Sequence, residues 1–137
     1  MKVNDEPAKR RRKAPRQRFA GSEHLFDLAA EGARLDMEPG GGRDGHRQIT
    51  LFRGGGVSIL LFDFEAGGWL KDHAADGYVT VHVLSGEIQM ATAEQTYRMP
   101  ARSLLVLRPG IRHDVRADTA SRMLLTVRLD PSEDARP

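Results

Sequence analysis

The strongest constraint on this chain is a series of short segments in which apolar and polar side chains alternate. Across Tyr78–Ser85 the alternation places Val79, Val81 and Val83 on one face of an extended strand, and Met123–Leu129 follows the same pattern. Turn-forming glycines and prolines separate such segments at intervals of about 8–12 residues, a spacing typical of sandwiches and barrels. Strands and helices do not alternate along the chain, so the sequence predicts an all-β domain.

The same alternation assigns faces to the first strands. Ile49, Leu51 and Arg53 are expected to share one face of a strand that ends at a Gly54–Gly56 turn. The next strand, Val57–Glu65, is apolar on both faces, which is the pattern of a strand covered on both sides. Because one of these faces needs a cover, we expect a homodimer.

Cap and turn residues mark the remaining boundaries. A short N-terminal helical segment is expected within residues 22–35, either a short helix or a strand that leads into a helix, with Ser22 as the N-cap and Gly32 weakening or ending the helix. Pro39–Gly45 reads as a turn-rich loop. Ser85–Glu87 is expected to form a hairpin turn between two consecutive strands.

Charge is distributed unevenly along the 137 residues. Residues 1–18 hold eight basic and two acidic side chains, whereas the remaining chain holds thirteen and seventeen. Like-charge runs with proline usually stay disordered. We therefore expect a disordered basic arm over residues 1–20, one barrel domain over residues 21–130 with its N-terminal segment, and a flexible tail over residues 131–137.

Several functional classes are excluded by composition. The chain has no cysteine, so disulfides and thiolate metal sites are impossible. No apolar run approaches the roughly 18 residues of a membrane span, and no hydrophobic core follows the N-terminal charges, so we expect a cytoplasmic protein. The Lys9–Lys13 run is the one candidate for nucleic-acid contact, with a solvated arm as the alternative interpretation.

Two segments carry a family resemblance. Gly67, His73 and Gly86 stand at fixed spacings in the first segment, and Gly110 and His113 do so in the second. Together they resemble the two-part motif of the cupin superfamily, in particular its small single-domain, conserved-barrel (cupin type-2) members. The resemblance implies a double-stranded β-helix, or jelly-roll barrel, with a pocket inside.

The resemblance also assigns a pocket. A complete cupin motif supplies three histidines and a glutamate to a metal, but Ala75 stands at the second histidine position and Val79 at the glutamate position. The pocket is expected to be lined by His73, Ala75, Val79, Val81 and His113. His73 and His113 are the two remaining candidate ligands for a weakly held divalent transition metal; the alternatives are pocket-lining polar groups or an acid/base pair.

Three functions follow from this degenerate motif. The first is a binding module for a small, partly apolar molecule. The second is a metal-dependent enzyme of the oxygenase or isomerase type that uses His73 and His113. The third rests on the resemblance of small cupins to the sensor barrels of some transcription regulators, which would require a separate DNA-binding protein. His82 alternates with Val81 and Val83, so it is expected to point away from the pocket.

Overall fold

The computed structural model describes residues 18–39 and 42–129, apart from the side chains of Asp72 and His73. The predicted tail and most of the predicted basic arm therefore lie outside the described residues. Within these ranges no helix is long and apolar enough to cross a membrane. The labelled elements are α2 (Leu28–Asp36), β1 (His46–Gly54), β2 (Val57–Phe64), β3 (Trp69–His73), β4 (Tyr78–Ser85), β5 (Glu87–Ala91), β6 (Thr96–Pro100), β7 (Leu104–Leu107), β8 (His113–Ala117) and β9 (Ser121–Arg128).

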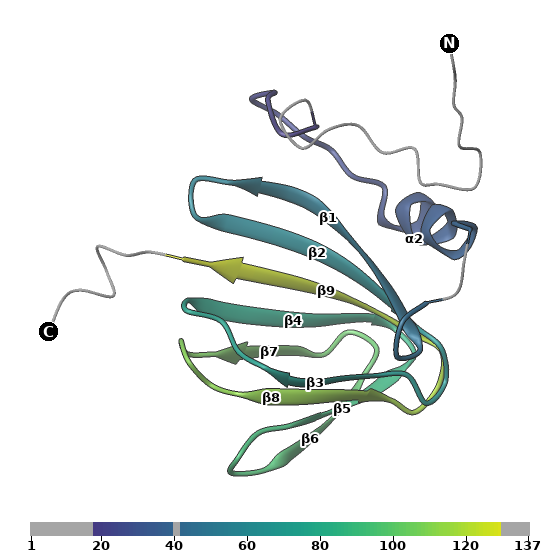
Figure 1. Cartoon of the computed structure of the whole chain (residues 1–137), viewed down its shortest axis with the longest axis vertical. Helices are drawn as coiled ribbons and strands as arrows, with labels where there is room; N and C mark the ends of the chain where they lie inside the picture. Colours follow the sequence, from purple (N-terminus) through teal and green to yellow (C-terminus); the bar gives the residue numbers. More distant parts are fainter. Residues whose placement is uncertain (1–17, 40–41, 130–137) are drawn as a thin grey trace, which may run out of the picture.

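The strands form two antiparallel sheets that face each other (Figure 1). The five-stranded sheet has the order β1-β2-β9-β4-β7, and the four-stranded sheet has the order β3-β8-β5-β6. Neighbouring strands in each sheet are mostly distant in sequence, as in a jelly roll. The predicted all-β jelly-roll barrel is confirmed.

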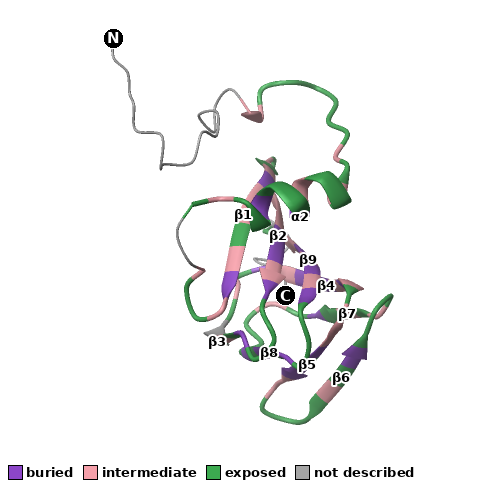
Figure 2. Cartoon of the chain, turned by 90° about the vertical axis from the view of Figure 1, so that its right-hand side faces the viewer, coloured by how far each residue is buried: buried purple, intermediate pink, exposed green. Residues whose placement is uncertain are grey.

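The core lies between the two sheets. Val79, Val81 and Val83 are all at most 3% exposed, and they pack in one cluster with Ile88 and Val115 of the opposite sheet. Burial is concentrated in the strands, whereas α2 is largely exposed on its outer side (Figure 2). The predicted valine face of β4 is therefore the core face.

The helix starts later than the sequence predicted. It spans Leu28–Asp36, and its N-cap is Asp27, whose side chain accepts a hydrogen bond from the backbone N–H of Ala30 at 3.1 Å. The prediction of Ser22 as the cap was wrong, because a carboxylate nearer the apolar stripe provides the acceptor. Gly32 does not end the helix but lies buried within it.

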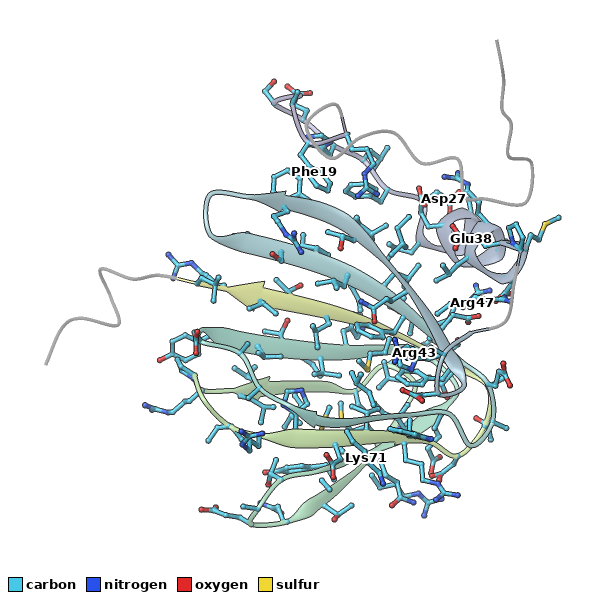
Figure 3. All side chains as sticks on the ribbon, in the orientation of Figure 1. Phe19, Asp27, Glu38, Arg43, Arg47 and Lys71 are labelled. Atoms are coloured by element: carbon cyan, nitrogen blue, oxygen red, sulfur yellow. The ribbon has the colours of Figure 1, made fainter. Side chains whose placement is uncertain are left out.

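The segment before the helix lies against β1. Arg18 donates a hydrogen bond to the carbonyl oxygen of Thr50 at 3.1 Å, and the ring of Phe19 contacts that of Phe52 with centroids 5.8 Å apart. Figure 3 shows Phe19 above β1 and Arg47 below α2. Arg47 donates to the carbonyl oxygen of Asp36 at 2.9 Å, so a cation sits at the C-terminal end of the helix, where it is favourable.

Arg122 of β9 fixes α2 to the outer face of the five-stranded sheet. Its guanidinium lies 2.8 Å from a carboxylate oxygen of Asp36 and 3.1 Å from one of Asp63. A Cβ on Gly32 would lie only 2.5 Å from this guanidinium, so the absence of a side chain at residue 32 lets Arg122 keep its position between the helix and the sheet.

Helix α2 covers part of the outer face of β2. It packs on β1 and β2, and Leu61 on the outer face of β2 is fully buried. The chain itself thus supplies the cover for β2 that a second copy was expected to provide, so that reason for a dimer was wrong. The homodimer stays a prediction.

Gly86 forms a corner between the two sheets. The expected hairpin over Ser85–Glu87 was wrong, because β4 belongs to the five-stranded sheet and β5 to the four-stranded one. Gly86 has a φ of 80°, and a Cβ there would lie 2.4 Å from the carbonyl oxygen of Ala120. Only glycine satisfies both the backbone conformation and the close approach.

Replacing Gly86 by alanine should destabilise the fold more than the same change at Gly67. Gly67 has a similar φ of 84°, but a Cβ there would meet nothing within 4 Å. We expect Gly67→Ala to lower the free energy of unfolding by about 1 kcal/mol through backbone strain alone. Gly86→Ala should cost at least about 3 kcal/mol because a backbone clash is added. Urea denaturation of both variants measures this, and equal losses would contradict the clash.

The Arg122 contact predicts a pH dependence of stability. Burial, together with a side-chain hydrogen bond to Asp36, raises the pKa of Asp63 from 3.8 to about 6, although Arg122 opposes the shift. The pKa of Asp36 is lowered, chiefly by the same hydrogen bond. Between about pH 4 and 6 the folded chain therefore holds a proton on Asp63 that the unfolded chain releases, and Asp63 makes the folded state less stable as the pH rises.

Asp63→Asn removes this titration. The free energy of unfolding of the wild type minus that of Asp63→Asn should fall between pH 4 and 6, by on the order of 1 kcal/mol once solvent screening is allowed for. Urea denaturation at half-unit pH steps measures the difference. Asp76→Asn, at an exposed position between β3 and β4, is the matched control for loss of one carboxylate. A constant difference across the window would refute the assignment.

Candidate functional site

A cavity of about 240 Å³ lies between the two sheets. Its exposed lining residues, Gln48, Arg53 and Ala74, mark where it opens to solvent. The walls come from β1, β2, β4 and β9 of one sheet, from β3 and β8 of the other, and from the segment after β3. The lining residues are Gln48, Arg53, Ser58, Leu60, Phe62, Leu70, Ala74, Ala75, Val79, His113, Leu125 and Val127.

Most of the wall is apolar. Leu60 and Phe62 of β2 pair with Leu125 and Met123 of β9, so the inward positions of these strands form one continuous hydrocarbon surface. Val79 extends this surface on β4. An apolar cavity of this kind favours a ligand whose body is hydrocarbon, with a few polar groups setting its orientation.

Few polar side chains reach the cavity. His113, at the start of β8, is only 3% exposed, and its Nδ1 lies 3.2 Å from the carbonyl oxygen of Ile111. Because a carbonyl only accepts, this contact favours the proton on Nδ1 of the neutral imidazole. At the β1–β2 turn, Nε of Arg53 donates to the hydroxyl oxygen of Ser58 at 3.4 Å. The lining residues that the structure describes include no aspartate or glutamate.

The structure brings most of the predicted pocket residues together. Ala75, Val79 and His113 line this cavity, whereas Val81 is fully buried in the core and is not among the lining residues. His73 is paired with His113 in the β3–β8 register, but its side chain lies outside the described part of the structure. His82 is half-buried on the opposite face of β4, where the alternation placed it.

The alternation of the sequence did not predict Arg53 in the cavity wall, because β1 contains a bulge. Ile49 pairs with Leu61 on the outer face, but the register shifts between Thr50 and Phe52, and Arg53 then pairs with Ser58 on the inner face. The expectation that Arg53 shares a face with Ile49 was therefore wrong. One extra residue in a strand reverses every later side chain, and nothing in the local sequence marks the insertion.

The residues present do not fit a cupin metal centre. Ala75 and Val79 line the cavity at the motif positions, and neither carries a donor atom. Among the residues that the structure describes, no group of three or more histidines, aspartates or glutamates could hold a metal ion. The motif leaves at most two imidazoles, fewer than the three protein ligands typical of a catalytic zinc site.

Restoring the two missing ligands tests this account of the site. The double variant Ala75→His/Val79→Glu should bind Co²⁺ at least about tenfold more tightly than the wild type, because each added ligand contributes more than the ~1.4 kcal/mol of a tenfold change. Calorimetric titration and the visible absorption of bound Co²⁺ measure it, after thermal melting has confirmed the fold. Equal affinity in both proteins would show that these two positions do not converge on one centre.

The two facing sheets with a cavity between them define a cupin barrel, and the chain is a member of the cupin superfamily. A family model described as the AraC-like ligand binding domain matches residues 63–136. The chain belongs to this family. The match covers β3 to β9, which include the motif positions and most of the cavity wall.

Solved structures support the same fold. A conserved Streptococcus pyogenes protein of unknown function is 25% identical, with a TM-score of 0.63, over 80% of this chain and 90% of that one. A cupin superfamily protein from Desulfitobacterium hafniense is 17% identical, with a TM-score of 0.65, over 82% of this chain and 96% of that one. An RmlC-like cupin from Desulfovibrio desulfuricans is 26% identical, with a TM-score of 0.55, over 59% and 79% of the two chains. No curated protein sequence matches this chain.

Proposed function

We propose that this chain is a small-molecule binding module whose ligand occupies the cavity between the two sheets. The observation that carries the proposal is the composition of the described wall: apolar residues stand at two motif ligand positions, and His113 is the one buried imidazole among the described lining residues. Membership of a family described by ligand binding supports the same conclusion. The module would hold its ligand without a resident metal.

The cavity volume limits the size of the ligand. An engineered apolar cavity of about 150 Å³ in another protein holds benzene, so about 240 Å³ suits a single substituted ring or a short aliphatic chain. Its walls offer hydrocarbon contacts from both sheets. The ligand would therefore be a small molecule in which apolar surface exceeds polar surface.

The metal-dependent oxygenase or isomerase remains the alternative, and the ligand count weighs against it. It would use His73 and His113 with a third ligand that the described part of the cavity wall does not provide. Metal content after purification without chelator, measured beside His73→Ala and His113→Ala, distinguishes the two. Stoichiometric metal that both variants lose would support the enzyme over the binding module.

Filling the cavity should abolish ligand binding. Ala75→Phe places a ring in the cavity, whereas Ala66→Phe adds the same ring at an exposed position in the β2–β3 turn. With benzyl alcohol and 1-hexanol as probes, we expect Ala75→Phe to weaken binding at least about tenfold, since most of the contact area is lost. Ala66→Phe should match the wild type. Calorimetry or chemical-shift titration measures this in the presence of EDTA, and equal binding by all three proteins would refute the site.

Three predictions from the sequence remain predictions. Nucleic-acid contact through Lys9–Lys13 concerns residues outside the described ranges. The homodimer and the cytoplasmic location also stay untested. On the outer face of the five-stranded sheet, Leu104 and Val106 are 63% and 57% exposed, so this surface rather than β2 is where a cover for apolar side chains would lie.

A further inference from the structure

We infer that the ligand is an anion: a small apolar molecule with one carboxylate, which Arg53 binds at the mouth of the cavity. The inference rests on the proposed function, because it takes the cavity as the binding site. It adds the chemical class of the ligand's polar end. Three observations carry it: the position of Arg53, its lack of a counter-ion within the described chain, and the composition of the wall around it.

The β-bulge brings Arg53 to the cavity. Without the shift between Thr50 and Phe52, the side chain at position 53 would lie on the outer face with Ile49. The bulge instead places it beside Ser58, on the face that continues through Leu60 and Phe62 into the cavity. Bulges commonly reorient a side chain beside a functional site.

Arg53 has no anionic partner among the described residues. Its hydrogen bond to the neutral hydroxyl of Ser58 is long, at 3.4 Å, and no ion pair involves it. Two other arginines do have carboxylate partners: Arg122 contacts Asp36 and Asp63, and Arg98 contacts Glu87. The guanidinium at the cavity mouth therefore keeps its capacity for a charge-assisted hydrogen bond.

The wall around Arg53 favours a monoanion. None of the described lining residues is acidic, so a ligand carboxylate would meet no like charge among them. A guanidinium matches the two oxygens of a carboxylate in a planar, bidentate arrangement. Ser58, which pairs with Arg53, adds a neutral hydroxyl that can donate a hydrogen bond beside it. A phosphate dianion would call for more positive charge than one arginine, whereas one carboxylate is matched by it.

The test compares each acid with its neutral isostere. The probes are benzoate against benzamide and hexanoate against hexanamide, titrated calorimetrically at pH 7 and low salt into the full chain. We expect the wild type to bind each acid at least about tenfold more tightly than its amide, the factor expected from a charged hydrogen bond at a solvated edge. Raising the salt concentration should weaken binding of the acids alone.

Variants of Arg53 test whether this side chain causes the preference for acids over amides. Arg53→Gln should bring the acid-to-amide ratio to about one, and Arg53→Lys should keep part of it because the charge remains. Arg116→Gln removes an exposed arginine of β8 that does not line the cavity, and it should retain the wild-type ratio. Thermal melting confirms that each variant is folded.

The outcomes separate the inference from the proposed function. If acids and amides bind the wild type equally, or if Arg53→Gln leaves the preference intact, the carboxylate inference is overturned while the apolar binding site stands. An intact preference would assign the anion to another group, with His113 the next candidate. If neither acids, amides nor alcohols bind the folded wild type, the proposed function itself fails.

Discussion

The structure depends on two antiparallel sheets sharing one apolar interior that they do not fill. Part of the interior is a packed core, formed by side chains that include Val81, Val83, Ile88 and Val115. Toward the β1–β2 turn the sheets separate, and the same inward-facing positions line a cavity instead of a packed core. Core and cavity wall are therefore parts of one surface, and whether a given inward-facing position is packed or lines the cavity depends on its place along the strand.

The sequence predicted the parts of this arrangement that depend on regular alternation. The valine face of β4 was assigned correctly, because each strand that buries one face repeats with a period of two. Two boundaries were not predictable in the same way. Ser85–Glu87 has the composition of a hairpin turn, but whether such a turn joins neighbours or crosses between sheets is decided by distant pairing. The helix start was predicted wrongly because two residues that can cap a helix, Ser22 and Asp27, precede the apolar stripe, and the cap is Asp27.

The site was predicted only as far as the family motif reached. Ala75, Val79 and His113 were placed by motif spacing, and all three line the cavity. Arg53 and the β2 wall lie outside the motif, and the bulge in β1 reverses the face that simple alternation assigns to Arg53. The motif therefore located Ala75, Val79 and His113 in the cavity wall, whereas the position of Arg53 at the cavity mouth depends on the register of the strands.

The position of β9 has a consequence for how the domain is assembled. It is the last described strand, yet it lies in the middle of the five-stranded sheet, paired with β2 on one side and β4 on the other. It also carries Arg122, which holds α2, and Leu125, which lines the cavity. The five-stranded sheet, the attachment of α2 and the cavity wall thus all require a strand whose partners are far away in sequence. Such non-local pairing makes folding slow. During synthesis, the cavity can close only after β9 has left the ribosome.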